Sequence, residues 1–161
     1  KGKFSNETNN SLVSLTDFYA TFAQMVNHKL KDEEAVDSYS IWPILSKQGA
    51  SNRKDLVYES GKGYLSLRTP QLKLVFNGGS GGWGYPNKPA DLAQLPPMQL
   101  FNLKEDPSEK ENIIHDKCYE QEVKEMTQLI RKYVKEGRST PGAEVANDTE
   151  NDWKQVNIFM Q

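Results

Sequence analysis

The chain has 161 residues, a formal net charge of −2, 36% hydrophobic residues and 26% charged residues. No basic stripe is present, which disfavours nucleic-acid binding, and no apolar run reaches the roughly 18 residues of a membrane-spanning helix. The mean hydropathy of −0.75 is low for a domain that folds on its own, and it indicates exposed tails or a piece of a longer protein. The start at Lys1, with neither an initiator Met nor a signal peptide, predicts a cut chain.

The residues that most often carry catalysis or bind metals are sparse. Cys118 is the one cysteine, which excludes an internal disulfide and a zinc cluster of several cysteines. It falls in a helical pattern, so we interpret it as a partly buried thiol and not as a nucleophile. His28 and His115 stand apart, and each is interpreted as a surface or packing residue. We therefore expect no catalytic residue and no metal ligand in this chain.

The first predicted helix begins near Ser14, which forms a capping box with Asp17. Apolar residues then recur at helical spacing and mark one face of the helix. They are Leu15, Phe18, Phe22, Met25 and Val26. A charged connection and a short apolar segment, residues 37–45, follow.

Four segments show the alternation of β-strands with short turns between the first three, which predicts an antiparallel meander. The segments are residues 56–60, 64–69, 72–76 and 99–103. Leucines fall on one face of the predicted sheet, whereas Arg68 and Lys73 fall on the other. Outward cations of this kind could bind a sulfate or simply face solvent.

A long loop rich in glycine and proline, residues 77–97, precedes the fourth strand. Long loops on a rigid sheet often carry function. Trp83 in this loop could stack on a sugar ring or cover the edge of the sheet. The glycine run lacks the Lys-Ser/Thr of a phosphate-binding loop, which disfavours a nucleotide site.

The last part of the chain predicts helices. Asp106-Pro107-Ser108-Glu109 has the residues of a helix start, and a longer helix is expected over residues 117–136. Its apolar stripe needs a sheet to cover, and Gly137 fits a left-handed cap at its end. The stripe comprises Tyr119, Val123, Met126, Ile130 and Tyr133.

The same region carries a family resemblance. LFNLKEDPSEKENI, the long helix and EGRSTPG together resemble the C-terminal part of a type I (arylsulfatase-like) sulfatase of the alkaline phosphatase superfamily. The segments SLVSLTDFYATFAQMV and YLSLRTPQLKLVF, and the GSGGW loop, resemble further parts of that family. The resemblance covers nearly the whole chain but only about the last third of a family member.

The predicted fold is α+β, with a four-stranded antiparallel sheet packed against a long C-terminal helix. The resemblance implies that the N-terminal helix belongs to the large domain of a parent protein. On this basis residues 1–50 are the end of that large domain, residues 51–142 are the C-terminal sulfatase subdomain, and residues 143–161 are a C-terminal tail.

The resemblance also implies what the parent does. Such sulfatases hydrolyse sulfate esters with Ca²⁺ and a formylglycine made in a Cys/Ser-x-Pro-x-Arg motif. Cys118 is followed by Tyr119 and Glu120, so that motif is absent here and we expect the isolated chain to be inactive. Its implied role is to complete the fold and line the substrate cleft, with Lys73, Arg68 and Trp83 as candidate rim residues.

The implied partners are an upstream catalytic domain of the same protein and a sulfated small molecule or sulfated glycan. The first helix could also pair two isolated chains, and the family implies a periplasmic or extracellular location. Two alternatives stay open. The chain could be the C-terminal part of a related phosphoesterase or phosphonate hydrolase, or a free-standing carbohydrate- or protein-binding module.

Overall fold

The computed structural model describes residues 8–47, 49–146 and 153–160. The chain forms two compact units, each made of two segments. One unit comprises Lys1–Leu56 and Tyr133–Asn147, and the other comprises Val57–Lys132 and Asp148–Gln161. The predicted domain boundaries concern a longer protein and stay predictions.

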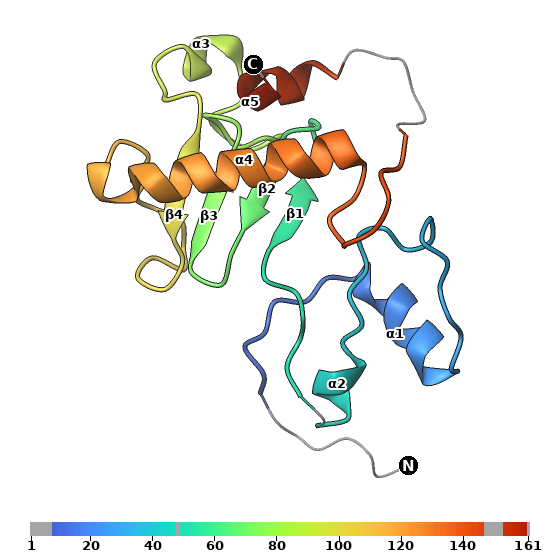
Figure 1. The fold of residues 1–161 in the computed structure, drawn as a ribbon. Coiled ribbons are helices and arrows are strands. Elements are labelled where there is room, and N and C mark those ends of the chain that lie inside the picture. Colours follow the sequence, from blue (N-terminus) through green and yellow to red (C-terminus); the bar gives the residue numbers. More distant parts are fainter. Residues whose placement is uncertain (1–7, 48, 147–152, 161) are drawn as a thin grey trace. The chain divides into compact units, whose positions relative to one another are not determined.

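The second unit is built on a four-stranded sheet with the order β1-β2-β3-β4 (Figure 1). Its strands are β1 (Leu56–Glu59), β2 (Leu65–Arg68), β3 (Leu72–Val75) and β4 (Gln99–Asn102). β3 pairs antiparallel with both neighbours, so Leu74 lies opposite Leu67 on one side and Leu100 on the other. These three leucines are fully buried, and the predicted sheet and its apolar face are confirmed.

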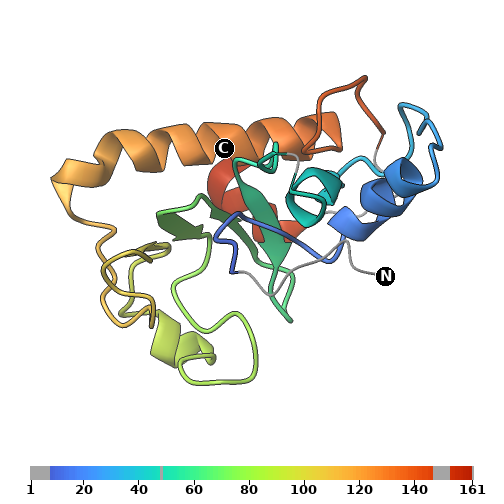
Figure 2. The ribbon, with the colours of Figure 1, turned by 90° about the horizontal axis from the view of Figure 1, so that it is seen from below.

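The predicted long helix is also present, as a short 3-10 turn η1 (Lys117–Tyr119) followed by α4 (Glu120–Glu136). Figures 1 and 2 show α4 running across one face of the sheet. Met126 and Ile130, in the middle of the apolar stripe, are 5% and 0% exposed. Burial of each such side chain is worth about 1.5–3 kcal/mol. The strongest sequence pattern in the chain therefore forms the central packing layer of this unit.

The end of α4 depends on a glycine, as predicted. Gly137 has φ +65°, and a Cβ there would lie 2.1 Å from the carbonyl oxygen of Val145. Any other residue would be strained in this conformation and would also clash with the backbone.

The C-terminal segment packs back onto the sheet unit through η2 (Lys154–Val156) and α5 (Asn157–Met160). The Phe159 ring is buried against that of Phe76, with centroids 4.5 Å apart. Trp153 Nε1 donates to the Gly63 carbonyl oxygen at 3.2 Å. The described residues of this end therefore dock on the sheet unit.

The predicted helix start at Asp106–Glu109 is wrong. Asp106 does accept backbone hydrogen bonds, from the N–H groups of Lys110 (2.6 Å) and Glu111 (2.8 Å), but it closes a turn and no helix follows. Glu109 has φ +54°, a left-handed conformation that interrupts a right-handed helix. Asp106 accepts backbone hydrogen bonds as expected, but the left-handed conformation of Glu109 cannot be recognised from the sequence of this segment.

The first unit holds α1 (Asp17–Met25) and α2 (Trp42–Leu45) around a buried ion pair. Asp17 and Arg53 lie 2.5 Å apart with side chains 0% and 1% exposed. Asp17 also accepts from the N–H of Ser14 (2.8 Å), as in half of the predicted capping box, and from that of Tyr39 (3.0 Å). The start of α1 is therefore fixed by one carboxylate that also organises the surrounding loops.

The apolar face of α1 is not part of this core. Its large side chains, among them Phe18, Phe22 and Met25, are 40–58% exposed. The buried side of the helix is small or polar instead, with Ala20, Thr21 and Ala23 beside Asp17. The described part of the chain supplies no cover for this face.

Candidate functional site

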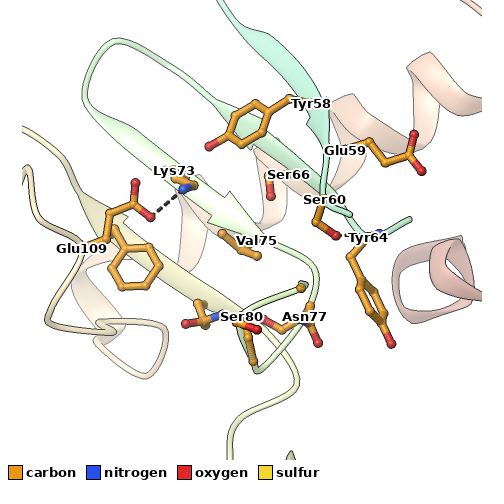
Figure 3. Close-up of a pocket in the computed structure, with 14 residues that line it drawn as sticks. Tyr58, Glu59, Ser60, Tyr64, Ser66, Lys73, Val75, Asn77, Ser80 and Glu109 are labelled. Carbon is orange, nitrogen blue, oxygen red and sulfur yellow. Dashed lines mark hydrogen bonds and ion pairs between the residues drawn. The ribbon is translucent and has the colours of Figure 1, made fainter. Parts of the chain in front are cut away.

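A polar pocket of about 320 Å³ lies on the sheet face that α4 does not cover. Side chains alternate across a strand, so the residues between the buried leucines point to this face. Figure 3 shows their arrangement. The lining includes Tyr58 from β1, Ser66 from β2, Lys73 and Val75 from β3, and Gln99 and Phe101 from β4.

Three charged side chains line the pocket, Lys73, Glu59 and Glu109, and Lys73 pairs with Glu109 from the loop after β4. Lys73 Nζ lies 2.5 Å from Glu109 Oε2, with side chains 16% and 35% exposed. The ammonium also lies 5.4 Å from the centroid of the Tyr58 ring, within the range of a cation–π contact. One carboxylate and one aromatic ring therefore hold this cation in a fixed position.

The pKa shifts in the pocket keep its donors protonated. Burial alone would lower the pKa of Lys73, but its interactions with Glu109 and Tyr58 outweigh this and raise that pKa above its usual value. Burial likewise raises the pKa of Tyr58, despite the opposing influence of Lys73. At neutral pH the pocket thus presents an ammonium and a phenolic O–H, which suit an anionic, oxygen-rich ligand.

The long loop forms one wall of the pocket. The side-chain amide of Gln99 donates to the carbonyl oxygens of Asn77 (2.8 Å) and Gly79 (2.9 Å) and ties the loop to β4. Gly81 has φ +66°, and a Cβ there would lie 2.8 Å from Cβ of Ser60. The wall is therefore set by close backbone approach as well as by hydrogen bonds.

The three candidate rim residues occupy different places. Lys73 lines the pocket. Arg68 pairs with Lys73 across β2 and β3, does not line the pocket, and has a buried Nε with no hydrogen-bond partner within the described ranges. Trp83 lies on the loop and is 89% exposed, so it does not cover the sheet edge. Their assignment as substrate-cleft rim residues stays a prediction.

Sequence analysis does not identify three of the residues that line the pocket as site residues. Strand alternation applied to β1 and β4 would have placed Tyr58 and Gln99 on the same face as Lys73. Glu109 lies 36 residues from its partner, and its side chain reaches the pocket from the turn that was misread as a helix. No local pattern could have found it.

The residues described here do not fit the implied Ca²⁺ and formylglycine. Across residues 8–47, 49–146 and 153–160, no group of three His, Cys, Asp or Glu side chains is placed to hold a metal. Cys118 is exposed, which corrects the expected partial burial. Its hydrogen bond with Asp116 raises the pKa of the thiol, the opposite of nucleophile activation. In the same ranges no helix is long and apolar enough to cross a membrane.

No protein-family model matches the chain, but its fold resembles solved sulfatase structures. A Bacteroides thetaiotaomicron protein designated 6S-sulf, from a locus for metabolism of multiple glycosaminoglycans, matches with a TM-score of 0.64 and 23% identity, over 81% of this chain and 26% of that one. A protein solved with its substrate D-glucosamine-2-N,6-O-disulfate matches with a TM-score of 0.51 and 22% identity, over 72% and 22% of the two chains.

A 2-O glycosaminoglycan sulfatase matches with a TM-score of 0.51 and 20% identity, over 73% of this chain and 24% of its own. The chain thus spans about a quarter of the length of the sulfatases that it resembles. At these identities the likeness establishes the fold. The chain has the α+β fold of one segment of a sulfatase.

Proposed function

We propose that the chain is the C-terminal part of an arylsulfatase-like sulfatase of the alkaline phosphatase superfamily, and that the whole protein hydrolyses sulfate esters. The observation that carries this proposal is the shared fold over 81% of the chain with a protein designated 6S-sulf. The order of the motifs along the sequence supports the same assignment independently of the coordinates.

In this proposal the sheet unit lines the substrate cleft through its uncovered face. The Lys73 ammonium binds and orients a sulfate or another anionic group of the substrate, and the Tyr58 hydroxyl donates a hydrogen bond to it. The polar groups around them suit the hydroxyls of a sugar. A sulfated sugar is therefore the favoured substrate class. One neighbour solved with its substrate D-glucosamine-2-N,6-O-disulfate and another that is a 2-O glycosaminoglycan sulfatase support it.

The chemistry is assigned to an upstream domain. Formylglycine and Ca²⁺ would supply the nucleophile and the polarisation of the sulfate there, and this chain alone would be inactive. The exposed face of α1 would pack on that domain, because its large apolar side chains find no cover in the described residues. In an isolated chain the same face would pair two copies. The whole protein would be periplasmic or extracellular.

The coding sequence upstream of Lys1 tests the proposal. A Cys/Ser-x-Pro-x-Arg motif there is the expected result. A Thr or Ser nucleophile without that motif would instead indicate the related phosphoesterase or phosphonate hydrolase. A stop codon or a signal peptide directly before Lys1 would indicate the free-standing binding module. The isolated chain, incubated with an aryl sulfate and calcium, should release no sulfate.

A further inference from the structure

We propose that Trp83 and Tyr85 form an aromatic platform on which a second sugar ring stacks, so that the ligand of this face is a sulfated oligosaccharide rather than a monosaccharide. This inference rests on the proposed function, because it assumes that a sulfated sugar occupies the neighbouring pocket. It adds a binding site outside that pocket and a minimum length for the ligand.

The two rings are unusually exposed. Trp83 is 89% and Tyr85 is 84% exposed. Large aromatic side chains bury 150–250 Å² when they are covered, so leaving two of them in water forgoes a large stabilisation. Both rings belong to one loop and leave their apolar area open to a flat, partly apolar ligand.

The loop that carries the rings is held in place. Ser80 Oγ donates to the Gly84 carbonyl oxygen at 2.6 Å, and Asn87 Nδ2 donates to that of Trp83 at 2.5 Å. The backbone N–H of Ser80 donates to the carbonyl oxygen of Pro86 at 2.8 Å. These bonds bracket the segment between Ser80 and Asn87 on both sides of each ring. A ligand would therefore meet a preorganised surface and would lose less entropy in ordering it.

The platform adjoins the pocket. Ser80 and Gly81 line the pocket, and Trp83 follows two residues later. The Trp83 ring stands over the β1–β2 turn, where a Cβ at Gly61 would lie 3.6 Å from it. Ser60, the residue before that glycine, lines the pocket as well. A ligand that extends out of the pocket past Ser60 and Ser80 thus reaches the Trp83 ring.

A sugar ring fits this arrangement better than an apolar ligand does. Pyranose rings present C–H groups on their faces and hydroxyls at their edges, so they stack on aromatic rings while staying solvated at the rim. The pocket beside the platform is lined by polar groups and holds the Lys73 ammonium, which match the hydroxyls and a sulfate of the same ligand. An alkyl chain would match the platform alone.

The test compares ligands of two lengths on the 161-residue protein. We would titrate it with D-glucosamine-2-N,6-O-disulfate and with a tetrasaccharide that ends in the same sugar, and follow the indole N–H signals of the three tryptophans by NMR. Trp83→Phe assigns the Trp83 signal and keeps an aromatic face. Trp83→Ala removes that face. Tyr19→Ala, at a ring 57% exposed on α1, is the matched control.

We expect the tetrasaccharide to shift the Trp83 signal and to bind about tenfold tighter than the monosaccharide, a gain of about 1.4 kcal/mol. Trp83→Ala should remove that gain without changing monosaccharide binding, whereas Trp83→Phe should keep most of it and Tyr19→Ala all of it. Equal affinities for the two ligands, or no effect of Trp83→Ala, would overturn the platform and leave the proposed function standing.

Two further outcomes distinguish the aromatic platform from the proposed role of the pocket. If the tetrasaccharide binds through Trp83 while Lys73→Ala changes neither titration, the platform stands and the proposed role of the pocket fails. If neither sugar binds at millimolar concentration, the platform is overturned together with that role.

Discussion

Lys73 and Glu109 form an ion pair at 2.5 Å on the sheet face that α4 leaves open. Lys73 lies in a regular strand, whereas Glu109 lies in a turn and has a left-handed backbone conformation. An anionic ligand in the pocket must share the ammonium with this carboxylate. Its affinity should therefore depend on Glu109 as well as on Lys73.

The stripe of α4 predicts a stability effect. Met126→Ala and Ile130→Ala should each lower the free energy of unfolding by about 2–5 kcal/mol, because each leaves a cavity between helix and sheet. Gln128→Ala, at an exposed position of the same helix, should change it by less than about 0.5 kcal/mol. Urea denaturation followed by circular dichroism measures all three. Unchanged midpoints for both core variants would show that the stripe is not core.

The buried pair of Asp17 and Arg53 predicts a second, local effect. Asp17→Ala leaves the guanidinium buried with its main acceptor removed, which should cost about 3–5 kcal/mol. Asp32→Ala is the control, because that carboxylate lies 3.5 Å from Arg138 but is 54% exposed, and exposed pairs contribute about 0–1 kcal/mol. Trp42 fluorescence, with Trp83 and Trp153 replaced by Phe, reports on this unit during denaturation. Similar losses for the two variants would contradict the account.

These elements also show what sequence reasoning can reach. Periodic patterns gave the four strands, the long helix and its glycine cap, because burial on one face forces a period of two or 3.6. Of the residues that line the pocket, sequence analysis proposed only Lys73 as a candidate site residue. Glu109 lies 36 positions from Lys73 in the sequence. Tyr58 and Gln99 come close to Lys73 only once the strands have paired in the correct register. Asp17 was identified as a capping residue, whereas its pairing with Arg53 depends on how the loops of the first unit fold.

Asp106 predicts an acid-sensitive turn. Hydrogen bonds from the backbone N–H groups of Glu111 and Lys110 lower the pKa of this carboxyl below its ordinary value. A group whose pKa is lower in the folded state stabilises that state above its unfolded pKa, near 3.9, and the contribution is lost as pH falls through the folded pKa. NMR titration should place the Asp106 midpoint below about 3.9, with the amide signals of Lys110 and Glu111 moving at the same pH. A midpoint at or above that value would contradict these contacts.

The exposed face of α1 predicts association of the isolated chain. Phe18 and Phe22 stack with ring centroids 5.5 Å apart, and covering each side chain is worth about 1.5–3 kcal/mol. Sedimentation over a concentration series should show a mass that rises towards a dimer, and Phe22→Ser should keep the chain monomeric. Leu95→Ser, at an exposed apolar position outside this face, is a control that should still associate. A wild-type mass that does not change with concentration would reject the pairing.

Sulfate release by the full-length protein that contains this chain tests the central claim most directly. With a sulfated monosaccharide such as D-glucosamine-2-N,6-O-disulfate, the wild type should release inorganic sulfate. Lys73→Ala should raise KM about tenfold or more, the equivalent of about 1.4 kcal/mol of lost binding, with a smaller change in kcat. Glu109→Gln should lower KM, because it frees the ammonium for the substrate. Release of phosphate from phosphoesters but no sulfate from sulfate esters, or an unchanged KM in both variants, would contradict the account.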